Sequence, residues 1–216
     1  YATNNEVLAG KNIDFPRPAA SLTKVMTAYT LLKNGLNLNG SQTYSPVDHQ
    51  ANYHSFRITA GERVYNLHLM YAGLISSLNT PMKMLVDAVE EDESEFVKWM
   101  NDQTAAWGLS KTEFADVTGE NQKSQTTARD YLTVYKNATN NIEVSKILGA
   151  KYYEYNELKD LDGNPRHYDY HSNELAAQTH AGFTILHSKT GYLDEAGDNL
   201  ALLIQRISDD KKFIII

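Results

Sequence analysis

A change of hydrophobic periodicity near Gly149 constrains the fold of this 216-residue chain more than any other feature. Between about residues 20 and 148, apolar side chains recur every three or four positions, which is typical of helices packed against a core. From about residue 150 to 216 the apolar runs are short and separated by turn residues, and about residues 1–15 have a similar pattern. We therefore predict an α/β (α+β) fold in one domain, residues 1–216, whose antiparallel sheet is built from both chain ends and packs against an inserted helical region.

Two local patterns position residues that matter for function. Apolar residues between 22 and 32 recur at helical spacing and Gly35 is a natural stop, so we expect a buried helix that begins directly after Ser21. Near the other end of the chain, Asp162-Gly163-Asn164 predicts a tight turn between extended segments at about residues 152–158 and 167–171.

Ser21-Leu22-Thr23-Lys24 places a serine and a lysine three positions apart at the start of this predicted helix. Residues i and i+3 share a helical face, so the Lys24 amine can reach the Ser21 hydroxyl. A serine hydroxyl becomes a good nucleophile only when a neighbouring base removes its proton, and a lysine can be that base if burial and positive charge lower its pKa from about 10.4. Alone the motif is weak, because about one such spacing arises by chance in a chain of this length.

Two further motifs follow in order along the chain. Ser77-Leu78-Asn79 lies between two predicted helices and offers a hydroxyl for proton relay and an amide for substrate binding. Lys189-Thr190-Gly191 lies at the end of a predicted strand, where it offers a second cation, a hydroxyl for a carboxylate and a glycine that allows close approach to the backbone. S-x-x-K, S-x-N and K-T-G together form the signature of penicillin-binding proteins and class A β-lactamases.

With these motifs the chain resembles, over essentially its whole length, the low-molecular-mass penicillin-binding proteins, a family of D-alanyl-D-alanine carboxypeptidases and endopeptidases. The segments that carry the resemblance are Glu6-Val7-Leu8 with Lys11-Asn12 as a first hairpin, residues 20–28, residues 126–130, Ser172-Asn173-Glu174-Leu175 and Ser188-Lys189-Thr190-Gly191-Tyr192. The resemblance implies a β-lactamase/penicillin-binding-protein-like fold.

The resemblance also implies a role for each motif residue. It marks Ser21, Lys24 and Ser77 as catalytic, and Asn79, Lys189, Thr190, Gly191 and Tyr192 as substrate-binding. Ser21 is then the nucleophile and Lys24 its base, while the backbone N–H groups of Ser21 and Tyr192 form the oxyanion hole.

The chain departs from the family pattern at two places. Thr80-Pro81 follows the S-x-N element, where family members commonly have a small or acidic residue and then alanine. Many members also have an arginine on a strand beyond K-T-G, and no clear counterpart precedes Ile216. Within the loop, Ser76 could occupy the position of Ser77 if the register shifts by one residue.

The implied function is cleavage of D-Ala-D-Ala bonds in peptidoglycan stem peptides through a Ser21 acyl-enzyme, with β-lactam antibiotics as covalent inhibitors. A class A-like β-lactamase shares the three motifs but also needs a glutamate in an E-x-x-x-N loop, and Glu154, Glu157 and Glu174 lack asparagine at that spacing. A non-catalytic penicillin-binding sensor is a third hypothesis, and the choice between carboxypeptidase and endopeptidase stays open.

Composition narrows the remaining possibilities. The chain has no cysteine, which excludes disulfides and thiolate zinc sites, and its formal charge of −7 gives no reason to expect nucleic acid. His167, Asp169 and His171 alternate like metal ligands, but no further ligand of matching spacing is evident, so we expect a surface or hairpin face there and no metal or other cofactor.

The apolar runs and the ends of the sequence indicate where in the cell the protein is expected. No run reaches the roughly 18–20 apolar residues that a membrane-spanning helix needs. We expect an extracytoplasmic protein, periplasmic or in the cell envelope, whose signal peptide has been removed and whose chain continues beyond Ile216.

Overall fold

The computed structural model describes residues 6–52, 56–90 and 92–216. The helices are η1 (Ala20–Leu22), α1 (Thr23–Lys33), α2 (Pro46–His49), α3 (Asn66–Leu74), α4 (Asn79–Asp87), α5 (Glu93–Ala106), α6 (Ala128–Thr139), α7 (Ile142–Leu148) and η2 (Glu174–Ala177). The strands are β1 (Arg17–Pro18), β2 (Ser41–Thr43), β3 (Arg63–Tyr65), β4 (Gln125–Thr126), β5 (Tyr152–Asn156), β6 (Arg166–Tyr170), β7 (Phe183–Leu193), β8 (Gly197–Arg206) and β9 (Lys212–Ile215).

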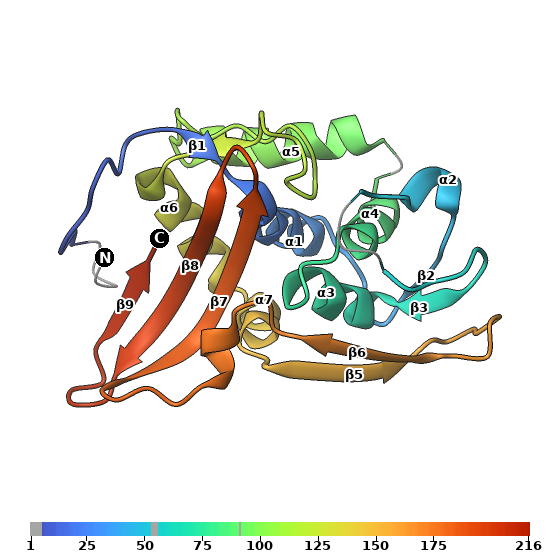
Figure 1. Cartoon of the computed structure of the whole chain (residues 1–216). Coiled ribbons are helices and arrows are strands. Elements are labelled where there is room, and N and C mark those ends of the chain that lie inside the picture. The colour runs from blue at the N-terminus through green and yellow to red at the C-terminus, as the bar shows by residue number, and fades with distance from the viewer. Residues whose placement is uncertain (1–5, 53–55, 91) are drawn as a thin grey trace.

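The main sheet is antiparallel and has the order β7-β8-β9. Helices α1, α6 and α7 lie behind it, and α3, α4 and α5 continue the helical region to one side (Figure 1). The predicted combination of an antiparallel sheet with a helical region before it is confirmed.

The contribution of the first residues to the sheet differs from the prediction. Residues 6–10 form no strand, and the apolar side chains of Val7 and Leu8 are 39% and 53% exposed. The segment turns at Asn12, whose carbonyl accepts a hydrogen bond from Phe15 N at 2.9 Å. The part of the prediction that falls on residues 1–5 lies outside the described residues.

Helix α1 is the centre of the core. Val25, Met26, Ala28 and Leu31 are completely buried, because α1 is in contact with α3, α4, α5 and α6 as well as η1. Its C-terminal end is followed by Gly35 with a φ of 88°, a left-handed conformation that glycine adopts without strain. The helix predicted for residues 22–32 is therefore confirmed.

Strands β5 and β6 form a separate hairpin below α3 (Figure 1), with Tyr152 opposite Tyr170 and Asn156 opposite Arg166. The turn predicted at residues 162–164 joins them, and Gly163 has a φ of 79°. His167 and His171 lie on the buried face of this hairpin, each 7% exposed.

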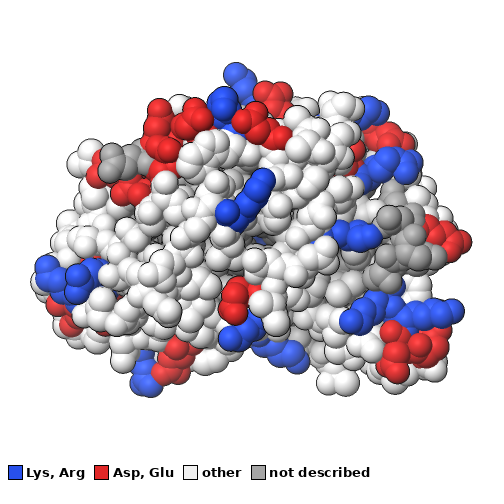
Figure 2. All heavy atoms as spheres, turned by 180° about the vertical axis from the view of Figure 1, so that it is seen from behind, with Lys and Arg blue, Asp and Glu red and all other residues white. Residues whose placement is uncertain are grey.

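Both signs of charge are present on the face opposite to the view of Figure 1. Lys and Arg side chains lie among Asp and Glu side chains around its edge, and single charged side chains of both signs also lie nearer its middle, among uncharged residues (Figure 2). Within the described part of the chain, no helix combines the length and hydropathy required to cross a bilayer.

Candidate active site

Ser21 lies in the one-turn helix η1, between strand β7 and the loop around Gly119. A Cβ atom on Gly191 of β7 would lie 2.9 Å from the Ser21 nitrogen, and one on Gly119 would lie 1.8 Å from the Ala20 carbonyl oxygen. Only glycine fits at either position. Ala20 itself has a φ of 48°, which is uncommon for a residue with a side chain. The backbone of Ser21 is therefore fixed on both sides.

Lys24 meets Ser21 as the helical spacing predicts. Its Nζ lies 2.8 Å from Ser21 Oγ and donates a second hydrogen bond to the Thr118 carbonyl oxygen at 2.7 Å. The Leu22 carbonyl between the two residues accepts a hydrogen bond from the buried Tyr131 hydroxyl at 2.9 Å. These bonds hold the Lys24 amine beside the Ser21 hydroxyl.

Burial makes the Lys24 amine lose its proton more easily than an ordinary lysine does. The side chain is completely buried, and this burial lowers the pKa of Lys24 to about 7, although the charges of Asp116 and Glu120 act in the opposite direction. A neutral amine is thus accessible near neutral pH, and it lies at hydrogen-bond distance from a serine hydroxyl.

Ser77 comes from the loop between α3 and α4 and has a φ of 63°. Its Oγ accepts a hydrogen bond from Lys189 Nζ at 2.7 Å, whereas Ser76 Oγ donates to the Tyr170 carbonyl at 3.1 Å. The structure therefore brings Ser77, and not Ser76, against the second lysine.

Lys189 projects from β7 and is also completely buried. Burial, and then the positive charge of Lys24, lower the pKa of Lys189 well below that of an ordinary lysine. Lys189 Nζ also donates a hydrogen bond to the carbonyl oxygen of the next residue, Thr190, at 2.8 Å, and Thr190 Oγ1 lies 2.5 Å from Ser172 Oγ. This grouping of a lysine and two hydroxyls is suited to binding a carboxylate.

Ser21 lies where two hollows meet. One, of about 430 Å³, is lined by Ser77, Thr190 and residues 172–175, and the other, of about 390 Å³, is lined by Asn79 and residues 119–122. Tyr192, which is 59% exposed, lines both. A chain bound across Ser21 would therefore extend into a hollow on either side of it.

The side chain of Asn79 also has a hydrogen-bond partner outside the three motifs. It is the first residue of α4, and its Nδ2 donates to the Asn52 carbonyl at 2.8 Å. The structure places it on the wall of the smaller hollow, together with Ser21.

Sequence reasoning missed the loop that supports Lys24. Asp116 Oδ2 accepts hydrogen bonds from Gly119 N at 2.9 Å, Glu120 N at 2.8 Å and the Thr118 hydroxyl at 2.8 Å. This folds the loop so that the Thr118 carbonyl faces the Lys24 amine. The pattern Asp116-Val117-Thr118-Gly119, an acid followed by a turn glycine, is the signal from which such a loop could have been expected.

Comparison with known proteins shows the family to which the chain is related. A family model described as D-alanyl-D-alanine carboxypeptidase matches residues 1–215. Over 208 residues the chain is 26% identical to a D-alanyl-D-alanine endopeptidase of Haemophilus influenzae, covering 93% of this chain and 67% of that protein. A D-alanyl-D-alanine endopeptidase of Pseudomonas aeruginosa is 29% identical over 126 residues, which cover 58% of this chain and only 41% of that protein.

Solved structures share the fold at lower identity. The D-alanyl-D-alanine carboxypeptidase of Mycobacterium tuberculosis H37Rv superposes with a TM-score of 0.85 at 21% identity, over 98% of this chain and 77% of that one. The DD-transpeptidase of Streptomyces K15 gives a TM-score of 0.86 at 23% identity, over 99% of this chain and 85% of that one. Because both identities are below 25%, these two similarities show a shared fold.

Proposed function

This chain belongs to the D-alanyl-D-alanine carboxypeptidase family of serine hydrolases, and from that premise we propose that it cleaves D-Ala-D-Ala-type peptide bonds in peptidoglycan through an acyl-enzyme on Ser21. The observation that carries the proposal is the buried Lys24 amine, 2.8 Å from Ser21 Oγ, with Ser77 and Lys189 in hydrogen-bond contact next to it. The proposed location is outside the cytoplasm, in the cell envelope where peptidoglycan lies.

The proposed reaction has two steps. Neutral Lys24 takes the Ser21 proton while Ser21 Oγ attacks the carbonyl carbon of the penultimate D-alanine, and the backbone N–H groups of Ser21 and Tyr192 stabilise the oxyanion. The peptide C–N bond breaks, the leaving amine takes up a proton by way of Ser77, and an ester on Ser21 remains. Water then hydrolyses the ester, which restores the serine and releases the shortened stem peptide.

Substrate orientation follows from the two hollows. The terminal carboxylate of the substrate binds Thr190 in the hollow of about 430 Å³, with the Ser172 hydroxyl beside it. Lys189 is completely buried and does not line this hollow, so it acts on the carboxylate as a nearby cation on the same strand as Thr190. The acyl side of the stem peptide lies past Asn79 in the other hollow. Gly191 allows this strand to lie close to Ser21, and a side chain there would push the two apart.

Product analysis of purified peptidoglycan tests the proposal. Release of free D-alanine from pentapeptide stems identifies a carboxypeptidase, and loss of cross-linked dimers identifies an endopeptidase; mass spectrometry separates the two. If neither product forms although penicillin acylates the protein, the chain is a non-catalytic sensor instead.

Acylation is expected to depend on pH through Lys24. The base must be neutral, and burial lowers the pKa of Lys24 to about 7, so the second-order rate constant for acylation should rise as pH increases through about 7 and then level off. Stopped-flow measurement with a fluorescent penicillin between pH 5.5 and 9 gives this profile. A rate that is constant or falls across this range would contradict the role of Lys24.

Glu120→Gln is the matched test of that profile. The charge of Glu120 raises the pKa of Lys24, so removing it should move the midpoint of the rise to lower pH, with a similar plateau rate. A midpoint that moves to higher pH would show that Lys24 is not the titrating group.

Deacylation is expected to separate a peptidase from a β-lactamase. The penicilloyl group retains its leaving fragment, which obstructs water, whereas a D-alanyl peptide releases its amine product by diffusion. We therefore expect the penicilloyl enzyme to persist for minutes or longer, measured by chasing labelled protein with unlabelled drug. Hydrolysis of penicillin on the order of 10–10³ per second would instead favour a β-lactamase.

The three glutamates that we considered as the base of a β-lactamase lie in different parts of the structure. Glu154 accepts a hydrogen bond from Tyr152 at 2.7 Å and Glu157 pairs with His167, both on the hairpin, while Glu174 is exposed on the wall of the larger hollow. Glu174→Gln should leave the slow deacylation rate unchanged. Rapid hydrolysis that disappears in this variant would identify Glu174 as the base of a β-lactamase.

A further inference from the structure

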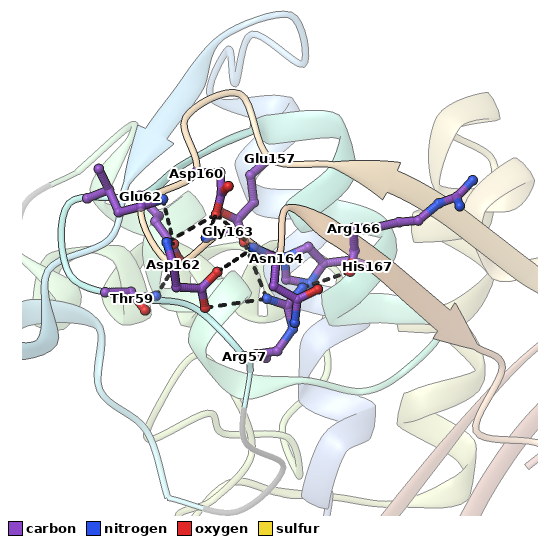
Figure 3. Close-up of polar contacts among 11 residues, drawn as sticks. Arg57, Thr59, Glu62, Glu157, Asp160, Asp162, Gly163, Asn164, Arg166 and His167 are labelled. Carbon is purple, nitrogen blue, oxygen red and sulfur yellow. Dashed lines mark hydrogen bonds and ion pairs between the residues drawn. The ribbon is translucent and has the colours of Figure 1, made fainter.

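A cluster of three carboxylates lies where the β5–β6 connection meets β3, in a part of the molecule that the proposed chemistry does not use (Figure 3). Glu62 directly precedes β3, while Glu157 and Asp160 follow β5. One oxygen of each carboxylate lies within 4.8 Å of the others. Like charges this close and this poorly hydrated repel one another unless a proton or a cation offsets them.

Backbone donors fix two of the three carboxylates. Glu62 is completely buried and accepts three backbone hydrogen bonds, from Thr59 N at 2.5 Å, Leu161 N at 3.0 Å and Asp162 N at 3.2 Å. Asp160 Oδ1 likewise accepts from the nitrogens of residues 162–164, at 3.0–3.2 Å. A carboxylate has about four lone-pair positions, so both groups keep positions with which to bind a further ligand.

Glu157 carries the observation that points to a ligand. Its side chain is 0% exposed, and its Oε1 lies 2.7 Å from His167 Nε2. Its Oε2 is buried and has no hydrogen-bond partner among the described residues. Buried polar atoms nearly always have a partner, so this oxygen marks a position for one.

The basic groups nearby, His167 and Arg57, face Oε1 of Glu157, the oxygen that already has a partner. His167 is engaged with Oε1 and stacks on Tyr155 at a ring separation of 4.8 Å. Arg57 Nη1 is 4.0 Å from the same oxygen and 3.8 Å from Asp162 Oδ2, and its side chain is 39% exposed. Neither basic group donates a hydrogen bond to Oε2, which leaves that oxygen for a further ligand.

We propose that Glu62, Glu157 and Asp160 bind one Ca²⁺ ion that joins the β5–β6 hairpin to β3. Carboxylate oxygens on a loop are the ligands that Ca²⁺ takes, in a flexible geometry of 6–8 oxygens. Mg²⁺ needs a near-ideal octahedron, and Zn²⁺ favours nitrogen and sulfur ligands, which the donor set does not match.

The role of the ion is structural. Arg63 of β3 already exchanges backbone hydrogen bonds with the connection, from Leu158 N at 2.7 Å and to the Lys159 carbonyl at 3.0 Å. The ion strengthens this junction. The same hairpin leads through β6 to Ser172, next to Thr190, so its stability matters for keeping the carboxylate-binding side of the cleft in place.

Calorimetry and thermal unfolding of the chelator-treated full chain test the proposal with Ca²⁺ as the probe. We expect one Ca²⁺ per chain, and a rise in Tm of about 5–10 °C at a free concentration about 100 times Kd. Mg²⁺ should bind at least about tenfold more weakly. Glu157→Gln and Asp160→Asn should each abolish the response, whereas Glu154→Gln, which removes one charge from the same hairpin outside the cluster, should retain it.

Glu157→Gln keeps the test informative even if the cluster affects folding. The substitution removes like-charge repulsion, so in chelator this variant should be at least as stable as wild type while giving no Tm shift with Ca²⁺. The proposal is overturned if wild type binds no Ca²⁺ at millimolar concentration, if Mg²⁺ binds equally well, or if both cluster variants respond like wild type.

Discussion

Ser21→Ala is expected to reduce hydrolysis of a D-Ala-D-Ala peptide by about 10⁶-fold, the scale on which a serine hydrolase depends on its nucleophile. The substitution removes the oxygen that forms the ester, and none of the neighbouring hydroxyls has the same relation to a lysine in the first turn of a helix. Lys24 keeps its hydrogen bond to the Thr118 carbonyl, so the fold should remain intact. Steady-state release of D-alanine measures the loss.

Ser110→Ala is a matched control, because Ser110 lies in the exposed loop after α5 and away from both hollows at Ser21. It should have wild-type activity. Both variants should have the thermal stability of wild type within a few degrees. Substantial activity in Ser21→Ala would mean that another residue is the nucleophile.

Lys24→Met is expected to slow acylation of Ser21 by about 10²–10⁴-fold, the range that a general base contributes. Methionine retains an unbranched apolar stem in the buried space but has no amine to take the Ser21 proton. Stopped-flow acylation by a fluorescent penicillin measures the rate constant directly, separately from peptide turnover.

Slower acylation caused by the missing Lys24 amine must be distinguished from slower acylation caused by a loss of structure. Lys33→Met at the exposed end of the same helix controls for the change of residue type, and circular dichroism tests whether α1 persists. If Lys24→Met acylates at the wild-type rate, the base lies elsewhere and the mechanism proposed here is wrong.

The part of the site that follows from local geometry was predictable. Ser21 and Lys24 are three residues apart on a helix, so their contact depends only on helical spacing. The turn at residues 162–164 and the cap that Thr127 provides for Asp130 N, at 3.0 Å, also follow from short sequence patterns.

The part that depends on tertiary packing was not predictable in the same way. Ser77 and Lys189 are 112 positions apart, and nothing in either motif specifies that their side chains share a hydrogen bond. The strand expected near residues 6–9 also shows this limit, because a strand requires a partner edge and an apolar face in contact with the core. His167 does lie on a hairpin face, but its burial and its contact with Glu157, ten positions away, could not be read from the alternation of His167, Asp169 and His171.

The most direct measurement of the central claim is the location of the acyl group. The protein is incubated briefly with benzylpenicillin, denatured and digested, and the labelled peptide is sequenced by mass spectrometry. One penicilloyl group per chain, on the peptide that contains Ser21 and absent from Ser21→Ala, is the predicted result. A label on Ser76, Ser77 or any other serine would contradict the assignment of Ser21 as the nucleophile.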